Sequence, residues 1–556
     1  MEKIELINLR KATPRTITLF QWLWKSSKGY RHPIFLNGFL GILHVLTGLL
    51  FIWCSKRVID TATGVHDGSI WIEGLYTALT LLFQILLGAC ETWLTNRIQV
   101  NAANNMRHHL FHRILHSRWN TLQQMHTGDI VNRIEQDTQQ VVTLLTSSLP
   151  TLIVAGVQLL AAFLFFCYLD ARLAWTVIGI APVCLLISKL YVRRMRRFTR
   201  EIRHSDSRIQ SVIQESVQHR TLIKTLEDHP QHLQQLGNLQ EILRKQINRR
   251  TRFSIFSRTS IAIGFGGGYL TAFLWGSYQL SQHFITFGTM TAFLQLVNQI
   301  QSPVYSLSRL IPGIVHTLTS AERLIELEKL PIEEGGDSIL LKATPNIQIK
   351  NVSFQYHDSR GEKAIFHKLN FFFPAGSSTA ILGETGAGKT TLVRLLLALT
   401  SPSEGYIRLD TMEESCIVSP QTRINFIYVP QGNTLFSGSI RDNLLMGNPK
   451  ATETEMRHVL KVAEAQFVFQ LLHGLDTSLA ENGEGLSEGQ AQRISIARSL
   501  LRPGGILLFD EATSALDTDT EHRLLENLRQ HYGQKTMIFI THHPTLAAYC
   551  DHILQI

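Results

Sequence analysis

The sequence has few charged residues for its length. They make up 17% of its 556 residues, whereas an average soluble chain has about 25%. The shortage is confined to residues 34–310, which hold nearly all the long apolar runs, and residues 346–556 have the mixed composition of a soluble α/β domain. A string of soluble domains is therefore excluded, and the sequence predicts a membrane half followed by a water-soluble half.

Cysteine and proline are also scarce. The six cysteines form no CxxC pair and four lie inside apolar runs, so they are better explained as packing residues than as disulfides or zinc ligands. Dispersal of the 16 prolines and 37 glycines excludes a collagen-like or disordered chain. The first 32 residues lack the early apolar core of a signal peptide, and residues 18–30 instead predict an amphipathic interfacial helix with Trp22 and Trp24 at headgroup level.

Six apolar segments are long enough to cross a bilayer, which takes about 20 mostly apolar residues. They cover residues 34–54, 71–93, 148–168, 172–192, 259–280 and 287–309. The connections 94–147 and 193–258 are long and contain many Lys and Arg residues, whereas 59–70 and 277–286 contain none. The long connections and both termini are therefore predicted to be cytoplasmic. This orientation explains the net charge of +9 without nucleic acid as a partner.

The two long connections are predicted to be helical. Apolar residues recur with helical spacing in 97–118, and 206–250 contains only one Pro and one Gly. The membrane helices should therefore continue into the cytoplasm, by about 20 Å or more at 1.5 Å per residue. Each would return through a short turn, near residues 117–127 and 214–229.

A phosphate-binding motif opens the soluble half. GETGAGKT at 383–390 matches GxxxxGK[ST] between an apolar strand, STAIL, and a helix, TLVRLLLAL. Glycines allow the backbone to approach a phosphate chain, the loop N–H groups donate to it, and a lysine adds a cation, while Thr390 is placed to bind Mg²⁺. The predicted nucleotide-binding residues of this loop are Gly383, Glu384, Thr385, Gly386, Ala387, Gly388, Lys389, Thr390 and Thr391.

A second motif, GILLFDE at 505–511, is an apolar strand that ends in two carboxylates. Asp510 is predicted to hold Mg²⁺ through water. Glu511 is placed to orient and deprotonate the attacking water.

Further segments carry a family resemblance. VPQ at 429–431, ENGEGLSEGQAQRISIARSL at 481–500, EATSALD at 511–517 and FITHH at 539–543 resemble the ATP-binding cassette (ABC) family in order and spacing across 346–556. HTGDIVNRIEQDTQQV at 126–141 resembles the segment after the first coupling helix of exporters with six membrane helices per subunit. Most of the chain thus resembles a half-size type IV exporter.

The resemblance implies roles for individual residues. Tyr356 would stack on adenine, Gln431 would sense the γ-phosphate and Mg²⁺, and His542 would hold the γ-phosphate during hydrolysis. The signature loop would cap ATP bound to the opposite subunit, through Ser487, Gly489 and Gln490. The expected catalytic residues are Glu511, Gln431 and His542. The expected Mg²⁺ ligands are Thr390, Gln431 and Asp510.

The same resemblance implies an all-α transmembrane domain of six helices followed by an α/β P-loop ATPase domain. The expected limits are 1–32 for the cytoplasmic N-terminus with its interfacial helix, 33–310 for the membrane domain, 311–345 for a linker and 346–556 for the nucleotide-binding domain. ATP and Mg²⁺ are the expected cofactors, and a second half-transporter subunit is the expected partner. An identical subunit is favoured because one chain contains every part of a hydrolytic site; a different half-transporter is the alternative.

The implied function is ATP-driven export of a hydrophobic or amphipathic substrate, such as a lipid, drug or peptide, across a bacterial inner membrane. The alternative is an ATP-gated regulator or channel with weak hydrolysis. The first apolar segment begins at residue 34, which leaves no room for the N-terminal peptidase domain of some peptide exporters, so self-processed peptides are less expected.

Two positions depart from the family pattern. Glu488 replaces the first glycine of the usual LSGGQ signature, and a carboxylate near a phosphate is repulsive. Ser487 and Gln490 can nevertheless form a capping box, and an acidic residue suits a helix start. The family pattern also continues beyond a strand such as DHILQI at 551–556 into a hairpin and a helix, whereas this sequence ends with that strand.

Overall fold

The computed structural model describes residues 16–122, 125, 127–358, 361–384, 386–480, 485–541 and 544–556. The chain divides into two compact units. Of the described residues, the helical unit comprises those from 16 to 111 and from 127 to 328, and the sheet unit comprises those within 112–126 and 329–556. The chain therefore passes from the helical unit into the sheet unit at residue 112, and residues 112–122 belong to the sheet unit.

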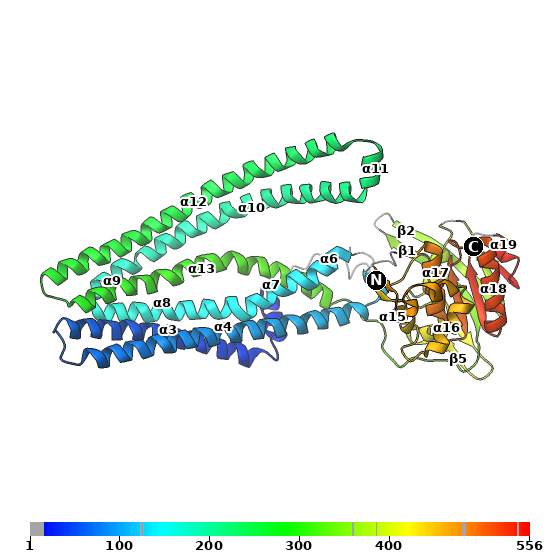
Figure 1. Ribbon diagram of the computed structural model, residues 1–556, viewed down its shortest axis with the longest axis horizontal. Coiled ribbons are helices and arrows are strands. Elements are labelled where there is room, and N and C mark those ends of the chain that lie inside the picture. The colour runs from blue at the N-terminus through cyan, green and yellow to red at the C-terminus, as the bar shows by residue number, and fades with distance from the viewer. Residues whose placement is uncertain are drawn as a thin grey trace. The chain divides into compact units, whose positions relative to one another are not determined.

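The helical unit is built from long helices with short connections (Figure 1). Its elements are α2 (Thr16–Ser26), α3 (Arg31–Ala62), α4 (Ile70–Leu115), α6 (Thr127–Asn132), the π-helix η1 (Arg133–Asp137), α7 (Thr138–Thr143), the π-helix η2 (Leu144–Ser148), α8 (Leu149–Leu169), α9 (Ala171–Ile178), α10 (Ile180–Gln218), α11 (Arg220–Thr225), α12 (His229–Ser281) and α13 (Phe287–Glu328). The six predicted apolar segments fall in α3, α4, α8, the α9–α10 pair, α12 and α13.

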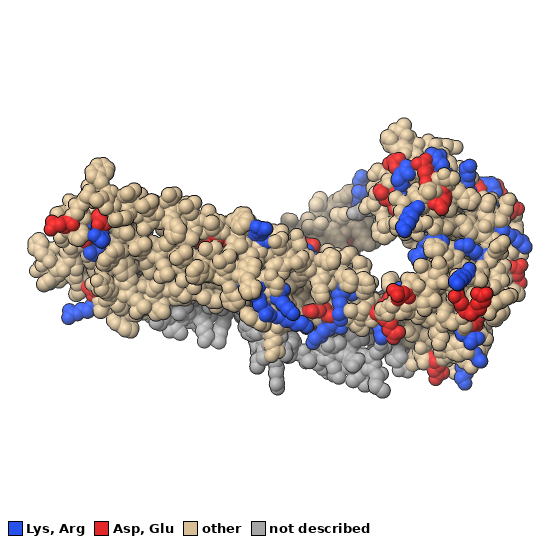
Figure 2. Space-filling view, turned by 90° about the horizontal axis from the view of Figure 1, so that it is seen from below, with Lys and Arg blue, Asp and Glu red and all other residues tan. Residues whose placement is uncertain are grey.

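The composition of these helices suits a bilayer. In the part of the chain that is described, Arg31–Ala62, Ile70–Leu115 and Thr127–Leu169 are long and apolar enough to cross a membrane. Large apolar side chains on α4 face outward, with Leu79 51% and Ile85 60% exposed, as expected where lipid replaces water. On the face shown in Figure 2, a broad stretch of the helical unit carries almost no charged side chains.

The core of this unit lies mainly between α8 and α13. Phe166 and Phe293 are fully buried and their ring centroids lie 5.5 Å apart, and Leu296 and Ile300 extend the same face of α13. These α13 residues recur at helical spacing, which places them on one stripe. The bundle is thus held by an internal apolar seam distinct from its outward apolar surface.

The predicted continuation of the helices beyond the apolar segments is confirmed. α4 continues to Leu115, and α10 and α12 run side by side in opposite directions, joined by α11 (Figure 1). The two predicted turns contain α5 (Trp119–Leu122) and α11. A helix was predicted at 18–30, and α2 spans Thr16–Ser26. Its position in the membrane interface stays a prediction.

The sheet unit contains a five-stranded parallel sheet in the order β11-β3-β10-β9-β6 and a four-stranded antiparallel sheet in the order β2-β1-β4-β5. The strands are β1 (Asn346–Asp358), β2 (Gly361–Phe373), β3 (Ser378–Leu382), β4 (Glu404–Asp410), β5 (Ser415–Ile417), β6 (Phe426–Val429), β9 (Ile506–Asp510), β10 (Thr536–Ile540) and β11 (His552–Gln555), and β7 (Gly438–Ser439) pairs with β8 (Ser478–Leu479). Every residue of β9 and β10 is buried, as expected for central strands of a covered parallel sheet.

Helices cover the parallel sheet. They are α14 (Lys389–Leu396), α15 (Ile440–Leu445), α16 (Glu453–Val462), α17 (Glu488–Leu500), α18 (Thr518–Tyr532) and α19 (Pro544–Ala547), with the 3-10 turns η3 (Pro420–Asn425), η4 (Gln466–Gln470) and η5 (Gly474–Asp476). Two apolar clusters result. One contains Ile427, Leu507 and residues of α16 and α17, and the other contains Ile381, Leu508 and residues of α14 and the antiparallel sheet.

The stretch around α5 packs within the sheet unit. Ser117 forms a β-bridge with Ile332, and the Asn120 amide donates to the Thr400 hydroxyl at 2.9 Å. Residues 112–122 are therefore tied to the chain that leads into β1. The expected boundary at residue 310 lies inside α13, which continues to Glu328, and the domain limits stay a prediction.

Candidate nucleotide-binding site

The phosphate loop connects β3 to α14. Gly386 has φ +89° and Gly388 has φ +115°, a backbone conformation that glycine adopts without strain. A Cβ on Gly388 would lie 2.6 Å from Ile365 Cγ2, so a larger residue does not fit there. The loop ends where α14 begins, which directs helix N-terminal N–H groups and the positive end of the dipole toward the loop. This is the geometry of an anion site.

Lys389 is buried beneath this loop with two oxygen partners. Its Nζ donates to the carbonyl oxygen of Gly383 at 2.8 Å and lies 3.7 Å from Glu511 Oε1. Thr390, the next residue, is exposed, and the Thr391 hydroxyl donates to the Tyr356 hydroxyl at 3.4 Å. The ammonium is therefore held near the loop, where phosphate oxygens could replace the carboxylate as its partner.

The predicted catalytic residues reach the same edge of the parallel sheet. β3, β6 and β9 are parallel strands of one sheet, so Gly383, Gln431 and Asp510 all lie at or just beyond its carboxyl edge. The Gln431 side-chain amide donates to Glu511 Oε2 at 2.7 Å. Glu511 has φ +50°, unusual for a residue with a Cβ, and its N–H donates to the Ile540 carbonyl at 3.0 Å. Such strain is commonly found at functional sites.

Asp510 lies in a poorly solvated position. Burial raises its pKa, and the neighbouring Glu511 carboxylate raises it further, while a hydrogen bond from Tyr428 opposes both. The Tyr428 hydroxyl donates to Asp510 Oδ2 at 3.2 Å, and burial beside this carboxylate raises the pKa of Tyr428. The carboxylate is thus buried close to a second one, an arrangement that a bound cation would stabilise.

The signature loop forms the N-cap of α17. Ser487 accepts from the Gln490 N–H at 3.2 Å, and the Gln490 side chain accepts from the Ser487 N–H at 3.0 Å. This confirms the predicted capping box. Glu488 is exposed in the first turn. A Cβ on Gly489 would lie 2.7 Å from the Ala515 carbonyl oxygen, so this position requires glycine.

Three predicted residues need separate mention. The Tyr356 hydroxyl accepts a hydrogen bond from Arg394 at 2.9 Å, and its ring packs edge-on against Phe354 at 4.9 Å. His542 and Thr385 lie outside the described residues. The sequence analysis missed Tyr428 and Arg394, although Tyr428 immediately precedes the VPQ segment and Arg394 lies on α14.

These features define a class of protein, a P-loop ATPase joined to a helical membrane unit. Matches to two family models confirm this class and identify the family. Residues 34–304 match the model described as "ABC transporter transmembrane region", and residues 366–514 match the model described as "ABC transporter". The chain belongs to the ABC transporter family.

Curated relatives span nearly the whole chain. An "ATP-dependent lipid A-core flippase" of Alcanivorax borkumensis is 27% identical over 89% of this chain and 85% of the relative. A Staphylococcus aureus protein named "Putative multidrug export ATP-binding/permease protein" is 28% identical over 95% of this chain and 93% of the relative. A solved bacterial Atm1-family ABC exporter with ATP bound has a similar fold, with a TM-score of 0.78 and 24% identity over 95% of this chain and 93% of that one.

The predicted family and fold class are therefore confirmed, and with them the activity. The chain is an ATP-driven exporter that binds ATP and couples its hydrolysis to transport. It is a multi-pass inner-membrane protein whose nucleotide-binding domain is cytoplasmic. As a half-transporter, it acts as a dimer.

Proposed function

We propose that this chain hydrolyses Mg²⁺-bound ATP with Glu511 as the general base. The observation that supports this most is the position of Glu511, whose two oxygens face Lys389 at 3.7 Å and Gln431 at 2.7 Å. Lys389 would bind the β- and γ-phosphates, and Gln431 would position the γ-phosphate and its water. Glu511 would then accept a proton from that water. His542 would stabilise the transferred phosphate.

The residues at this edge fit Mg²⁺. The expected ligands are the Thr390 hydroxyl, the Gln431 side-chain oxygen and Asp510, which is a set of oxygen donors as this hard cation prefers. The raised pKa of Asp510 also supports a cation here, because burial of the bare carboxylate is unfavourable. Bound Mg²⁺ would neutralise charge on the β- and γ-phosphates. Tyr428 would hold the Asp510 carboxylate in position.

We infer that the dimer contains two identical subunits. Each chain has both a complete phosphate loop and a signature loop with its cap intact, so two copies would form two equivalent sites. In each site, Ser487, Gly489 and Gln490 of one copy would cap ATP held by the phosphate loop of the other. Tyr356 would stack on the adenine ring.

We further propose that the substrate is a lipid or another amphipathic compound. The names of the two relatives, a lipid A-core flippase and a multidrug exporter, support a membrane-soluble substrate class. The outward apolar surface of α3, α4 and α8 supports a protein that works within the bilayer.

The test is transport by the purified protein in proteoliposomes. ATPase activity would be measured with panels of lipids, dyes and peptides, and active compounds would then be followed for ATP-dependent movement across the vesicle membrane. Lipids or amphipathic dyes should stimulate hydrolysis several-fold and move only in the wild type, not in Glu511→Gln. Stimulation by peptides alone would contradict the substrate class. Nucleotide-gated ion flux without stimulated hydrolysis would instead indicate a channel.

A further inference from the structure

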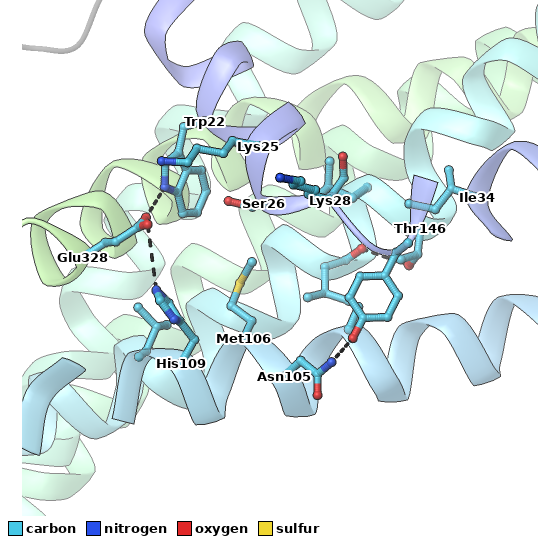
Figure 3. A pocket seen from close by; sticks show the side chains of 16 residues that line it. Trp22, Lys25, Ser26, Lys28, Ile34, Asn105, Met106, His109, Thr146 and Glu328 are labelled. Atoms are coloured by element: carbon cyan, nitrogen blue, oxygen red, sulfur yellow. Dashed lines mark hydrogen bonds and ion pairs between the residues drawn. The ribbon is translucent and has the colours of Figure 1, made fainter. Parts of the chain in front are cut away.

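A cavity lies within the helical unit beside α2. Its volume is about 290 Å³, at the small end of the roughly 300–1,000 Å³ typical of small-molecule sites. α2 and the turn after it form one side, and α4 with the η2 region forms the other (Figure 3). The aliphatic part of the lining consists of Ile34, Ala102, Met106, Leu110, Val142 and Leu145. A space of this size and lining could hold a polar headgroup and the start of an alkyl chain.

Most polar groups around the cavity already have partners within the protein. The Trp22 indole N–H donates to Glu328, and His109 Nε2 lies 3.9 Å from the same carboxylate. The Tyr30 hydroxyl accepts from Asn105 and donates to a backbone carbonyl. Figure 3 shows the contacts of Trp22 and His109 with Glu328 on the cavity wall. These groups therefore shape the cavity but leave little hydrogen-bonding capacity for a ligand.

Lys25 and Lys28 differ from these residues. Both line the cavity from α2 and its C-terminal turn, and both are exposed. Among the described residues, neither ammonium forms an ion pair, and Glu328, the one carboxylate of the lining, is bonded to Trp22 instead. The cavity thus combines an apolar floor with two ammonium groups that pair with no carboxylate in the described part of the chain.

We propose that this cavity binds the headgroup of an anionic phospholipid from the cytoplasmic leaflet. The phosphate would lie between Lys25 and Lys28, and the first carbons of an acyl chain would pack on Met106 and Leu145. α2 is an amphipathic helix of the kind that lies in the membrane interface, so the cavity would be at headgroup depth. The anionic surface of that leaflet provides the ligand. This site is separate from the transported substrate.

Native mass spectrometry of the purified transporter in mild detergent would test the site. It would be titrated with phosphatidylglycerol, with phosphatidylcholine of the same acyl chains, and with glycerol 3-phosphate as the soluble phosphate. Each basic residue near an anionic surface raises the affinity for it by about five-fold. Two lysines should therefore make the affinity for phosphatidylglycerol about 25-fold higher than that for phosphatidylcholine. The preference should disappear in Lys25→Ala/Lys28→Ala.

Matched variants distinguish a cavity from general charge attraction. Lys224→Ala/Lys245→Ala removes two exposed lysines of the same unit away from the cavity and should keep the full preference. Ala102→Phe should fill the cavity and abolish the preference with both lysines present. Basal ATPase activity and thermal stability of the lysine variants should match the wild type.

Three results would overturn the proposal. They are an unchanged lipid preference in Lys25→Ala/Lys28→Ala, an equal loss of preference in the control pair, and an affinity for glycerol 3-phosphate as high as that for the lipid. The last would assign the cavity to a soluble phosphate compound. If Ala102→Phe does not fold, the two lysine pairs decide the question alone.

Discussion

Replacing Glu511 with glutamine should slow hydrolysis and tighten ATP binding together. The variant keeps the shape of the side chain and its contact with Gln431 but removes the proton acceptor. A positioned general base contributes about 10²–10⁴-fold, or about 3–5 kcal/mol of activation free energy. We therefore expect turnover to fall by at least about 10². Single-turnover hydrolysis measures this step directly.

The tighter ATP binding expected in Glu511→Gln depends on Lys389. Its ammonium lies 3.7 Å from Glu511 Oε1, and the two side chains are 9% and 19% exposed. At this distance two unit charges attract by about 1 kcal/mol in water and about 4 kcal/mol at an effective dielectric constant of 20. ATP phosphates must compete with this carboxylate for the same ammonium. Removing the negative charge should lower the Kd for ATP by about ten-fold or more, as measured by calorimetric titration.

Glu526→Gln is the matched control, because Glu526 is exposed on α18 and the substitution is identical. It should change neither turnover nor ATP affinity. Wild-type turnover in Glu511→Gln would refute the role of this residue as the base. Slow turnover with weaker ATP binding would refute the competition between Glu511 and the phosphates for Lys389.

Three further substitutions test other parts of the sheet unit. Lys389→Ala should weaken ATP binding by about ten-fold or more, because a phosphate ligand is lost in the ground state; unchanged affinity by titration would contradict the phosphate-loop assignment. Glu488→Gly should lower the ATP concentration for half-maximal ATPase by a few-fold, since one exposed negative charge is removed from the signature loop. Asp551 accepts from the Ser378 N–H and hydroxyl, which hold its pKa below its usual value. The Asp551 carboxylate therefore stabilises the folded protein above its unfolded pKa of about 4, and this stabilisation is lost as pH falls. Tm should decrease less between about pH 5 and 3 in Asp551→Ala than in the wild type.

Much of the fold could be predicted because it depends on local patterns. The long helices beyond the apolar segments follow from helical apolar spacing and from the near absence of glycine and proline in residues 206–250, which include the end of α10, α11 and the start of α12. The phosphate loop depends on glycines at fixed offsets, which the structure places at positive φ at Gly386 and Gly388. Capping of α17 depends only on residues three positions apart. In each case, neighbouring residues in the sequence determine the geometry.

Contacts between distant segments could not be predicted in the same way. Lys389 and Glu511 are far apart in the chain and meet only because β3 and β9 flank β10 in one parallel sheet. The pairing of Tyr428 with Asp510 needs the same strand order. In the membrane helices, the Gln299 side-chain oxygen accepts a hydrogen bond from the Gln158 side-chain amide at 2.6 Å. Sequence spacing alone does not identify such a partner on another helix.

In the signature loop, position 488 can accept a residue other than glycine, whereas position 489 cannot. The glycine at 489 faces the Ala515 carbonyl oxygen so closely that any Cβ would clash. The side chain at 488 instead points to solvent in the first turn of α17, where a carboxylate favours the helix dipole by about 0.3–1 kcal/mol. Because Ser487 and Gln490 cap the helix without any contribution from residue 488, the loop tolerates glutamate there. Glu488 would therefore act through the charge it adds to the signature loop, because the loop folds without any contribution from this side chain.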